Sequence, residues 1–530
     1  MTSNNLIVKT LSRYKNTPLP VKAALWFMVC GFLQRGVSMI TTPIFTRVLS
    51  TEQYGLYSTY LSWESLLLMI TSLSLFKAMM NLYVKYDNQE HILSTVSGLT
   101  LVLTIFWFVI AIFIKDILAE ILGLTPVLVV CMFSYFIFQA EIQCWSLHKR
   151  YIYDYKTLLV ATLAVTVGSS VVGCLAVLFI SPTAEARALM NVLVTGVVGV
   201  AVYISVFRRC KDFKDNEVWN FAVVFCVSLM PHYLSEFILN GSDKIMINYL
   251  CGSSDVAIYS VAYSIGALIN LVTNSVNSTF APYQYQKIKS GEYDLLSKRA
   301  NEVLGLVAAM LFALMLFSKE IVLIFGGQKY IDSVNLIVPI CIGIYFNYMF
   351  QLFARVQEYF EKKLTVVIPS VLCAIMNIVL NYVFIKLYGY QAVAYTTVFS
   401  YMFFCVIHYI FYRKVCKELL DGKNIYDVRG ILLISAITIA GGILISIINK
   451  FDFIKYLIIA IACVAAIIFR KRLLLLVRRI MSKKTFAHRE IENDRYYFCY
   501  NGKCINSIIS AVLICRINSV SVYVLVSIYS

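Results

Sequence analysis

The feature that most constrains this chain is a succession of apolar segments, each long enough to cross a lipid bilayer. A transmembrane helix needs about 20 apolar residues, and about 14 such segments follow one another along the chain. Backbone polar groups have no water to bond to in lipid, so spanning segments of this kind form helices. The sequence therefore predicts an all-α polytopic membrane protein.

The predicted spans are separated by short polar or charged loops. We expect them near residues 22–46, 54–76, 92–114, 124–146, 157–180, 188–207, 218–240, 256–281, 303–325, 333–357, 364–386, 390–412, 430–449 and 453–470.

The composition agrees with a membrane protein and excludes several other classes. The chain is 60% hydrophobic and 14% charged, whereas soluble domains carry about 25% charged residues. Its net charge is +17, but no basic block with interleaved aromatics indicates nucleic-acid binding. The 15 Cys lie mostly in apolar segments without a Cys-x-x-Cys pair, which predicts reduced thiols. The scattered His residues and the lack of a phosphate-binding loop indicate no metal, no cofactor and no enzyme.

Lys and Arg gather in alternate loops, which predicts the orientation in the membrane. Cytoplasmic loops carry the excess of these residues, so the N-terminus and the basic stretch 470–484 are expected in the cytoplasm. Residues 1–22 show no cleavable signal sequence, and the first span is expected to direct its own insertion.

Two charged linkers, 208–217 and 413–429, divide the spans into six, six and a final pair. Equal halves are typical of duplicated transporters. We therefore expect four parts, namely an N-terminal lobe, a C-terminal lobe, an extra helix pair with a basic segment, and a dispensable tail: 1–217, 218–412, 413–485 and 486–530. A further span at 507–530 is an open alternative, with Arg516 in its middle.

A stripe of polar residues runs along the seventh predicted span. Its members recur at helical spacing and share one side of the helix: Ser228, His232, Glu236, Asn240 and Asp243. Ionisable groups in a membrane usually face a bundle interior or a wet cavity. Glu236, with His232 and Asp243, is therefore a candidate site for coupling to H⁺ or Na⁺, and Pro231 permits a bend beside it. The alternative is structural: Glu236 pairs with Lys244 or forms hydrogen bonds between helices.

Arg35 and Glu64 lie near the middles of the first two predicted spans. Their similar distance from the connecting turn would place them at similar depth in a helical hairpin. One interpretation is a structural ion pair. The other is that Arg35 binds an anionic substrate, since a guanidinium bonds two phosphate oxygens at once, and that Glu64 modulates this binding. The two interpretations are compatible.

Two further polar stripes are candidates for lining a substrate cavity. The eighth span carries phenols and amides that suit sugars, and the alternative is hydrogen bonding between helices: Tyr259, Tyr263, Asn270, Asn274 and Asn277. The tenth span adds Tyr348 and Arg355, although snorkelling alone would account for Arg355. Lys244 is a further cationic candidate for substrate contact.

Several short motifs, in order and at matching spacing over roughly residues 20–412, resemble one known family. They are Thr42–Tyr57, Asn240–Lys244, Ala257–Tyr263, Phe280–Tyr283 with Lys287, Asn377–Asn381, Gly389 and Ala392–Ala394. The chain resembles the Wzx-type flippases for O-antigen and other oligosaccharide units, which belong to the multidrug/oligosaccharidyl-lipid/polysaccharide (MOP) superfamily. It departs from the family in Lys244, where Arg is common, and in Ala392–Ala394, where Gly-Ala-Ala is usual.

The resemblance implies two six-helix lobes around a central cavity in a bacterial inner membrane. It implies translocation of undecaprenyl-diphosphate-linked oligosaccharides, as in lipopolysaccharide synthesis, by alternating access coupled to a cation gradient. Implied partners are membrane lipids, the polysaccharide polymerase and the chain-length regulator. A multidrug/cation antiporter of the same superfamily is the main alternative. A polytopic glycan polymerase fits less well because the predicted outward loops are short.

Overall fold

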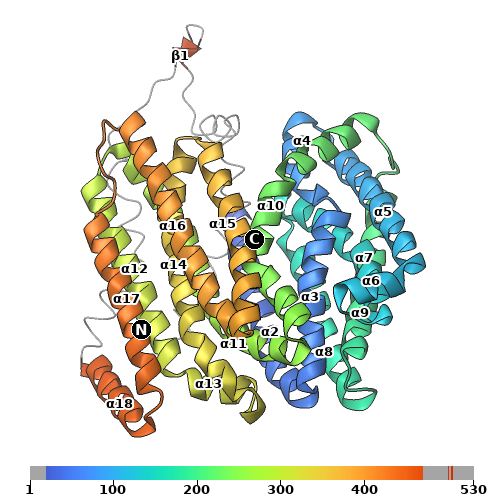
Figure 1. Ribbon diagram of the computed structural model, residues 1–530. Coiled ribbons are helices and arrows are strands. Elements are labelled where there is room, and N and C mark those ends of the chain that lie inside the picture. The colour runs from blue at the N-terminus through green and yellow to red at the C-terminus, as the bar shows by residue number, and fades with distance from the viewer. Residues whose placement is uncertain (1–18, 469–498, 501–502, 505–530) are drawn as a thin grey trace, which may run out of the picture. The chain divides into compact units, whose positions relative to one another are not determined.

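The computed structural model describes residues 19–468, 499–500 and 503–504, and this part of the chain is built almost entirely of helices (Figure 1). The long helices are α2 (Leu19–Val48), α3 (Thr51–Thr71), α5 (Gln89–Phe113), α7 (Pro126–Tyr151), α8 (Tyr155–Phe179), α9 (Ala184–Arg209), α10 (Asn216–Leu250), α11 (Ser253–Ser290), α12 (Tyr293–Leu316), α14 (Val334–Tyr359), α15 (Lys363–Tyr388), α16 (Ala392–Leu419), α17 (Val428–Ile448) and α18 (Asp452–Ile468).

Shorter elements connect or follow these helices. They are η1 (Leu75–Ala78), α4 (Met79–Lys85), α6 (Lys115–Leu122), α13 (Ser318–Phe325), η2 (Gln328–Ser333) and the two-residue strands β1 (Cys499–Tyr500) and β2 (Lys503–Cys504). The strands pair antiparallel. Apart from these four residues, the predicted tail 486–530 and its possible span 507–530 lie outside the described residues.

The predicted fold class is confirmed, because every predicted span overlaps a long helix. Within the described residues, 10 helices are long and apolar enough to cross a membrane, or up to 12 if each of two bent pairs is one span. The predicted boundaries were wrong in two places. The seventh predicted span, 218–240, does not end near residue 240 but continues to Leu250, since neighbouring helices satisfy the Asp243 carboxylate. The ninth breaks at Phe317 into α12 and α13.

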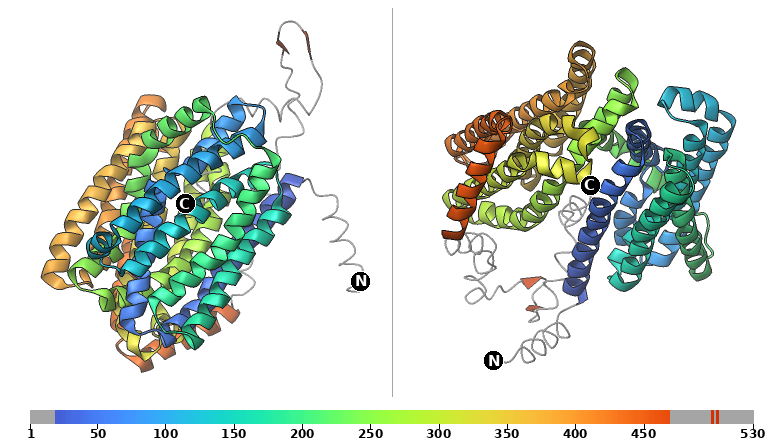
Figure 2. Two further views of the ribbon diagram at one scale, coloured as in Figure 1. Left: turned by 90° about the vertical axis from the view of Figure 1, so that its right-hand side faces the viewer. Right: turned by 90° about the horizontal axis from the view of Figure 1, so that it is seen from below.

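The first of two compact units comprises residues up to Gly266, Ser318–Gly343 and Val366–Phe404. In it α7 packs against α5 and α9, and α8 packs against α9 and α2 (Figures 1 and 2). α5 buries residues such as Ile92 near its start but exposes large apolar side chains such as Phe113 near its end. An apolar surface of this kind is suited to contact with lipid.

The second unit comprises Ala267–Phe317, Ile344–Thr365 and the chain from Cys405 onward. Its helix α12 packs against α17, where a Cβ at position 441 would lie 2.7 Å from the Phe312 ring, so a glycine permits this approach. Three rings also pack together in this unit, with the centroid of Phe353 5.3 Å from that of Tyr412 and 6.0 Å from that of Tyr426.

Two bends interrupt the long helices of the first unit. After α3 the chain turns by 52° before η1 and α4, and the Ser72 hydroxyl both donates to Leu68 O and accepts from Ser74 N. α10 bends by 51° between Pro231 and Tyr233, where proline cannot donate the helical hydrogen bond. The bend expected from Pro231 is therefore confirmed.

The turn between α2 and α3 is held by segments far along the chain within the first unit. The Thr46 hydroxyl donates to Phe325 O at 2.5 Å, and Lys329 Nζ donates to Leu49 O at 2.7 Å. Gly55 in the first turn of α3 touches the start of α11, because an added Cβ would lie 1.6 Å from Ser253 O. A side chain at position 55 would push these helix ends apart.

We expect Gly55→Ala to lower the stability of the protein, since inserting a methyl group into such a contact costs about 1–3 kcal/mol. The measurement is the midpoint of thermal unfolding in detergent. Gly305→Ala in α12 is the matched control, because nothing lies within 4 Å of a Cβ there. An unchanged midpoint for Gly55→Ala would contradict the close approach.

Candidate functional site

The carboxylate of Asp243 is the centre of the candidate site. Its side chain is 3% exposed and lies on α10 within the first unit. Tyr259 on α11 donates from its hydroxyl to Oδ2 at 2.5 Å, and Thr397 on α16 donates to the same oxygen at 3.2 Å. Asn381 on α15 donates from its amide to Oδ1 at 2.8 Å. Four helices thus meet at one carboxylate.

The Asn381 amide extends this polar cluster. Its oxygen accepts a hydrogen bond from Thr396, and its Nδ2 also lies 3.3 Å from the Asn377 amide oxygen. Asn377 in turn donates to the Ser400 hydroxyl at 3.2 Å. We define the Asp243 cluster as Asp243, Tyr259, Asn377, Asn381, Thr396 and Thr397.

Sequence reasoning assigned Asp243 to ion coupling and Tyr259 to the substrate stripe, interpreted Asn377 and Asn381 as helix packing, and missed both threonines. The sequence did contain a pattern that could have indicated these four residues. Two amides lie one helical turn apart, and a Thr-Thr pair follows in the next span. Packing was the simpler explanation because amides often bridge membrane helices.

Asn240, one turn before Asp243 on α10, is held by two tyrosines. Tyr401 donates to its amide oxygen at 3.0 Å, and Tyr263 donates to its backbone oxygen at 3.0 Å. The ammonium of Lys244 lies 5.3 Å from the centroid of the Tyr263 ring. Tyr263 and Lys244, two of the predicted substrate-contact residues, thus lie beside the Asp243 cluster.

Glu236 lies two turns before Asp243 and is only partly buried. Among the residues that the structure describes, Glu236 and Lys244 form no ion pair, so this form of the structural alternative is not observed. Lys77 of η1 interacts electrostatically with Glu236, and its Nζ lies 3.2 Å from the centroid of the Tyr233 ring. The side chain of His232 lies outside the described residues.

In the second unit, Asn277 of the eighth predicted span contacts the polar stripe of the tenth. Arg355 on α14 donates to the Asn277 amide oxygen at 2.6 Å, and Asn277 donates to Gln351. Tyr348 is 3% exposed. Asn270 is half-buried and Asn274 is exposed. Hydrogen bonding therefore holds the Arg355 guanidinium, whereas snorkelling was the simpler sequence interpretation.

Arg35 and Glu64 do not meet. Arg35 is exposed in the middle of α2, and nothing in the described part of the chain forms a hydrogen bond or ion pair with it. Glu64 on α3 is buried, and its Oε2 has no hydrogen-bond partner among the described residues. The hairpin is not held by an ion pair between these two residues.

One buried cation lies in a helix of the first unit, although the predicted spans 157–180 and 188–207 leave it in the loop between them. Arg187 in the first turn of α9 is 7% exposed, donates to Ser169 O at 3.0 Å and lies over the Phe45 ring. A Cβ at position 173 would lie 2.5 Å from its guanidinium, so Gly173 makes room for it. In the sequence, the only indication that Arg187 is buried was its position next to a predicted span boundary.

The Asp243 cluster has the chemistry of a cation site. A carboxylate, amide oxygens and hydroxyls are the hard oxygen ligands that alkali and alkaline-earth cations prefer. A buried carboxylate that no cation neutralises can also take up a proton. The oxygen atoms that would bind the cation come from four helices. A change in the relative positions of those helices therefore changes the set of ligands.

Comparison with known proteins places the chain in a family of polysaccharide biosynthesis proteins. The family model described as polysaccharide biosynthesis protein matches residues 21–286, and the MatE model matches residues 228–383. The chain is 23% identical over 274 residues to the probable low-salt glycan biosynthesis flippase Agl15 of Haloferax volcanii, a match that spans 50% of this chain and 56% of that protein.

Two solved structures share the fold. An inward-facing multidrug resistance MATE family transporter of the MOP superfamily aligns over 74% of this chain and 96% of its own, with a TM-score of 0.54 and 14% identity. The lipid II flippase MurJ in an inward closed conformation aligns over 82% of this chain and 100% of its own, with a TM-score of 0.56 and 13% identity. Because the first family model covers half of the chain, the protein belongs to the polysaccharide biosynthesis protein family within the MOP superfamily.

Proposed function

We propose that the protein is a flippase that moves undecaprenyl-diphosphate-linked oligosaccharide units, of the O-antigen or a similar surface polysaccharide, across a bacterial inner membrane. The family match and the glycan biosynthesis flippase among its relatives support the substrate class. The work is transport without covalent catalysis, in partnership with membrane lipids, a polymerase and a chain-length regulator. The basic loops support a cytoplasmic N-terminus. The charged linkers 208–217 and 413–429 support lobes at 1–217 and 218–412, followed by a helix pair with a basic segment at 413–485 and a dispensable tail at 486–530.

The single observation that carries the mechanism is the buried Asp243 carboxylate, which receives three hydrogen bonds and no ion pair among the described residues. A group in this state has a different affinity for H⁺ or Na⁺ once its donors move away. The bend at Pro231 on the same helix supplies a place for that movement. Cation binding and alternating access are thereby coupled, as differential affinity for two states requires.

Substrate binding involves two arginines in this proposal. Arg35 is exposed within an apolar helix, where a charge is costly unless it faces a wet cavity or an anion. Arg355 is oriented by Asn277 and leaves part of its fork for other acceptors. Guanidinium groups suit diphosphate, and amides and phenols suit sugars: Tyr263 in the first unit, and Asn270, Asn274, Asn277 and Tyr348 in the second. In the first unit, Glu64 and Lys244 modulate the charge that the substrate meets, and His232 and Glu236 assist coupling.

A multidrug/cation antiporter is the second candidate, and the MatE match over residues 228–383 favours it. Such a transporter would carry cationic compounds, which a lining with exposed Arg35 disfavours. Transport of a lipid-linked oligosaccharide and of a cationic dye by the same purified protein distinguishes the two functions.

Asp243→Asn is expected to lower the rate of gradient-dependent transport of a lipid-linked oligosaccharide in proteoliposomes. Losing one charge-assisted contact of about 1.5–3 kcal/mol corresponds to a fall in rate of about tenfold or more. The measurement is the rate with an imposed Na⁺ or H⁺ gradient, relative to the rate without one.

Asp255→Asn is the control for this variant, since Asp255 is a half-buried carboxylate of the same unit outside the Asp243 cluster. Glu236→Gln is measured alongside. If only Glu236→Gln loses the response, coupling belongs to Glu236. If all three variants respond to gradients as the wild type does, neither carboxylate couples transport.

Arg35→Ala is expected to eliminate surface polysaccharide in a strain that lacks the native protein, without lowering protein abundance. Arg35→Lys should restore only part of it, because an ammonium is a point charge without the planar fork. Arg208→Ala, at an exposed arginine near the end of α9, is the control. Because Arg35 and Glu64 do not pair, the double change to Ala should do no better than Arg35→Ala. Normal polysaccharide from Arg35→Ala would contradict the role.

A further inference from the structure

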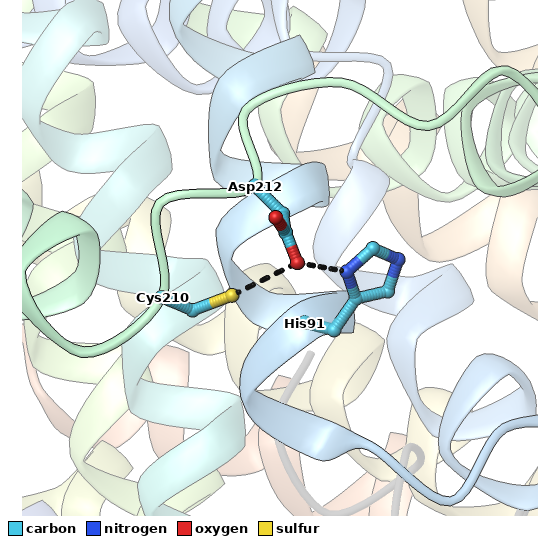
Figure 3. Close-up of side chains that lie close together, drawn as sticks. All are labelled: His91, Cys210 and Asp212. Carbon is cyan, nitrogen blue, oxygen red and sulfur yellow. Dashed lines mark hydrogen bonds and ion pairs between the residues drawn. The ribbon is translucent and has the colours of Figure 1, made fainter.

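We propose that His91, Cys210 and Asp212 form a binding site for a divalent transition-metal ion such as Zn²⁺. One nitrogen, one sulfur and one carboxylate oxygen from these residues lie within 4.8 Å of one another (Figure 3). His91 is in the first turn of α5, and the other two belong to the linker between α9 and α10. All three lie in the first compact unit. Zinc prefers this combination of imidazole, thiolate and carboxylate.

The three side chains need to move little for their ligand atoms to bind one zinc ion. Asp212 Oδ2 lies 2.7 Å from His91 Nδ1 and 3.3 Å from Cys210 Sγ. In a tetrahedral zinc site with bonds of about 2.0–2.3 Å, ligand atoms lie about 3.3–3.6 Å apart. The Asp212 carboxylate must therefore move outward by about half an ångström, which its exposed place on an irregular segment allows. A water molecule would take the fourth position.

The imidazole of His91 is already oriented for this role. Its second nitrogen, Nε2, lies 3.1 Å from Asp215 Oδ2, and metal-binding histidines usually donate their other ring N–H to such a carboxylate. Asp215 is itself fixed, because its Oδ1 accepts from the backbone N–H groups of Glu217 and Val218 at the start of α10. The metal would replace the proton on Nδ1.

The linker is held against α5 independently of any ion. Ser94 donates to Cys210 O at 2.8 Å, and Trp219 donates from its indole to Thr95 O at 2.9 Å. A Cβ at position 98 would lie 2.1 Å from Phe213 O, so Gly98 lets the linker lie directly on the helix. The backbone at His91 and at Cys210 is therefore fixed before an ion binds, which lowers the entropy cost of binding.

Metal binding competes with protons at two of the three ligands. The Asp212 and Asp215 carboxylates raise the pKa of His91, so its imidazole must lose a proton to bind the ion. The hydrogen bond from His91 holds the pKa of Asp212 below its usual value, so this ligand is ionised at neutral pH. Burial raises the pKa of the Cys210 thiol, so the ion must displace its proton, and binding weakens as the pH falls.

The test measures how fast an alkylating reagent modifies Cys210 in the full-length protein, purified in detergent without a polyhistidine tag and stripped of metal. Peptide mass spectrometry assigns the modification to each cysteine. Added Zn²⁺ at ten times its dissociation constant should slow modification of Cys210 by about tenfold. Cys251, the other partly exposed cysteine among the described residues, should react at an unchanged rate.

His91→Gln and Asp212→Asn should each remove this protection, whereas Glu217→Gln should keep it, because Glu217 pairs with Lys85 outside the site. Asp212 is exposed, so its variant keeps the test valid if His91→Gln fails to fold. Co²⁺ provides a second readout, since a thiolate-to-cobalt absorption band should appear and be lost in Cys210→Ser. Equal modification with and without Zn²⁺, or protection that persists in Asp212→Asn, would overturn the proposal and leave His91 as an ionic contact between α5 and the linker.

Discussion

The absence of water inside a bilayer is the constraint on which this structure depends. Each backbone N–H and C=O group must find a partner within the protein, and an isolated segment achieves this only as a helix. Where the chain departs from a helix, other groups compensate for the missing backbone hydrogen bonds. At the bend after α3 the Ser72 hydroxyl both donates and accepts, and the bend in α10 occurs at Pro231, which has no N–H to satisfy.

The same constraint applies to side chains. A polar group inside the protein is costly unless it is hydrogen-bonded, and several buried ionisable groups among the described residues have hydrogen-bond partners. Asp243 receives three donors, Arg187 bonds Ser169 and lies against aromatic rings, and Glu141 accepts from Ser97 at 2.9 Å. Glycines such as Gly173 supply the space. The costly groups are thus concentrated where helices meet, and a movement of those helices changes their energy.

The two candidate ion sites differ because their surroundings differ. The Asp243 cluster lies among helices and offers carboxylate, amide and hydroxyl oxygens, which suit a hard cation or a proton that is bound and released. The site at His91 joins a helix end to a linker and offers nitrogen and sulfur as well, which suit a transition metal. The first is built from four helices and is therefore sensitive to conformation. The second would restrain one linker on one helix.

The sequence by itself determined the helical class, the approximate spans and the bend at Pro231, because hydrophobic length and proline act locally. It also identified Asp243, Tyr259, Asn277 and Arg355 as polar groups at helical spacing. Only the tertiary structure decided which of them meet. Asn381 reaches Asp243 from 138 residues away, and Arg355 reaches Asn277 from 78 residues away. The tertiary structure also decided that Arg35 and Glu64 lie apart. It likewise decided that His91 lies close to Cys210 and Asp212. Periodicity tells which side of a helix is polar, but the neighbour that this side faces depends on how distant helices pack.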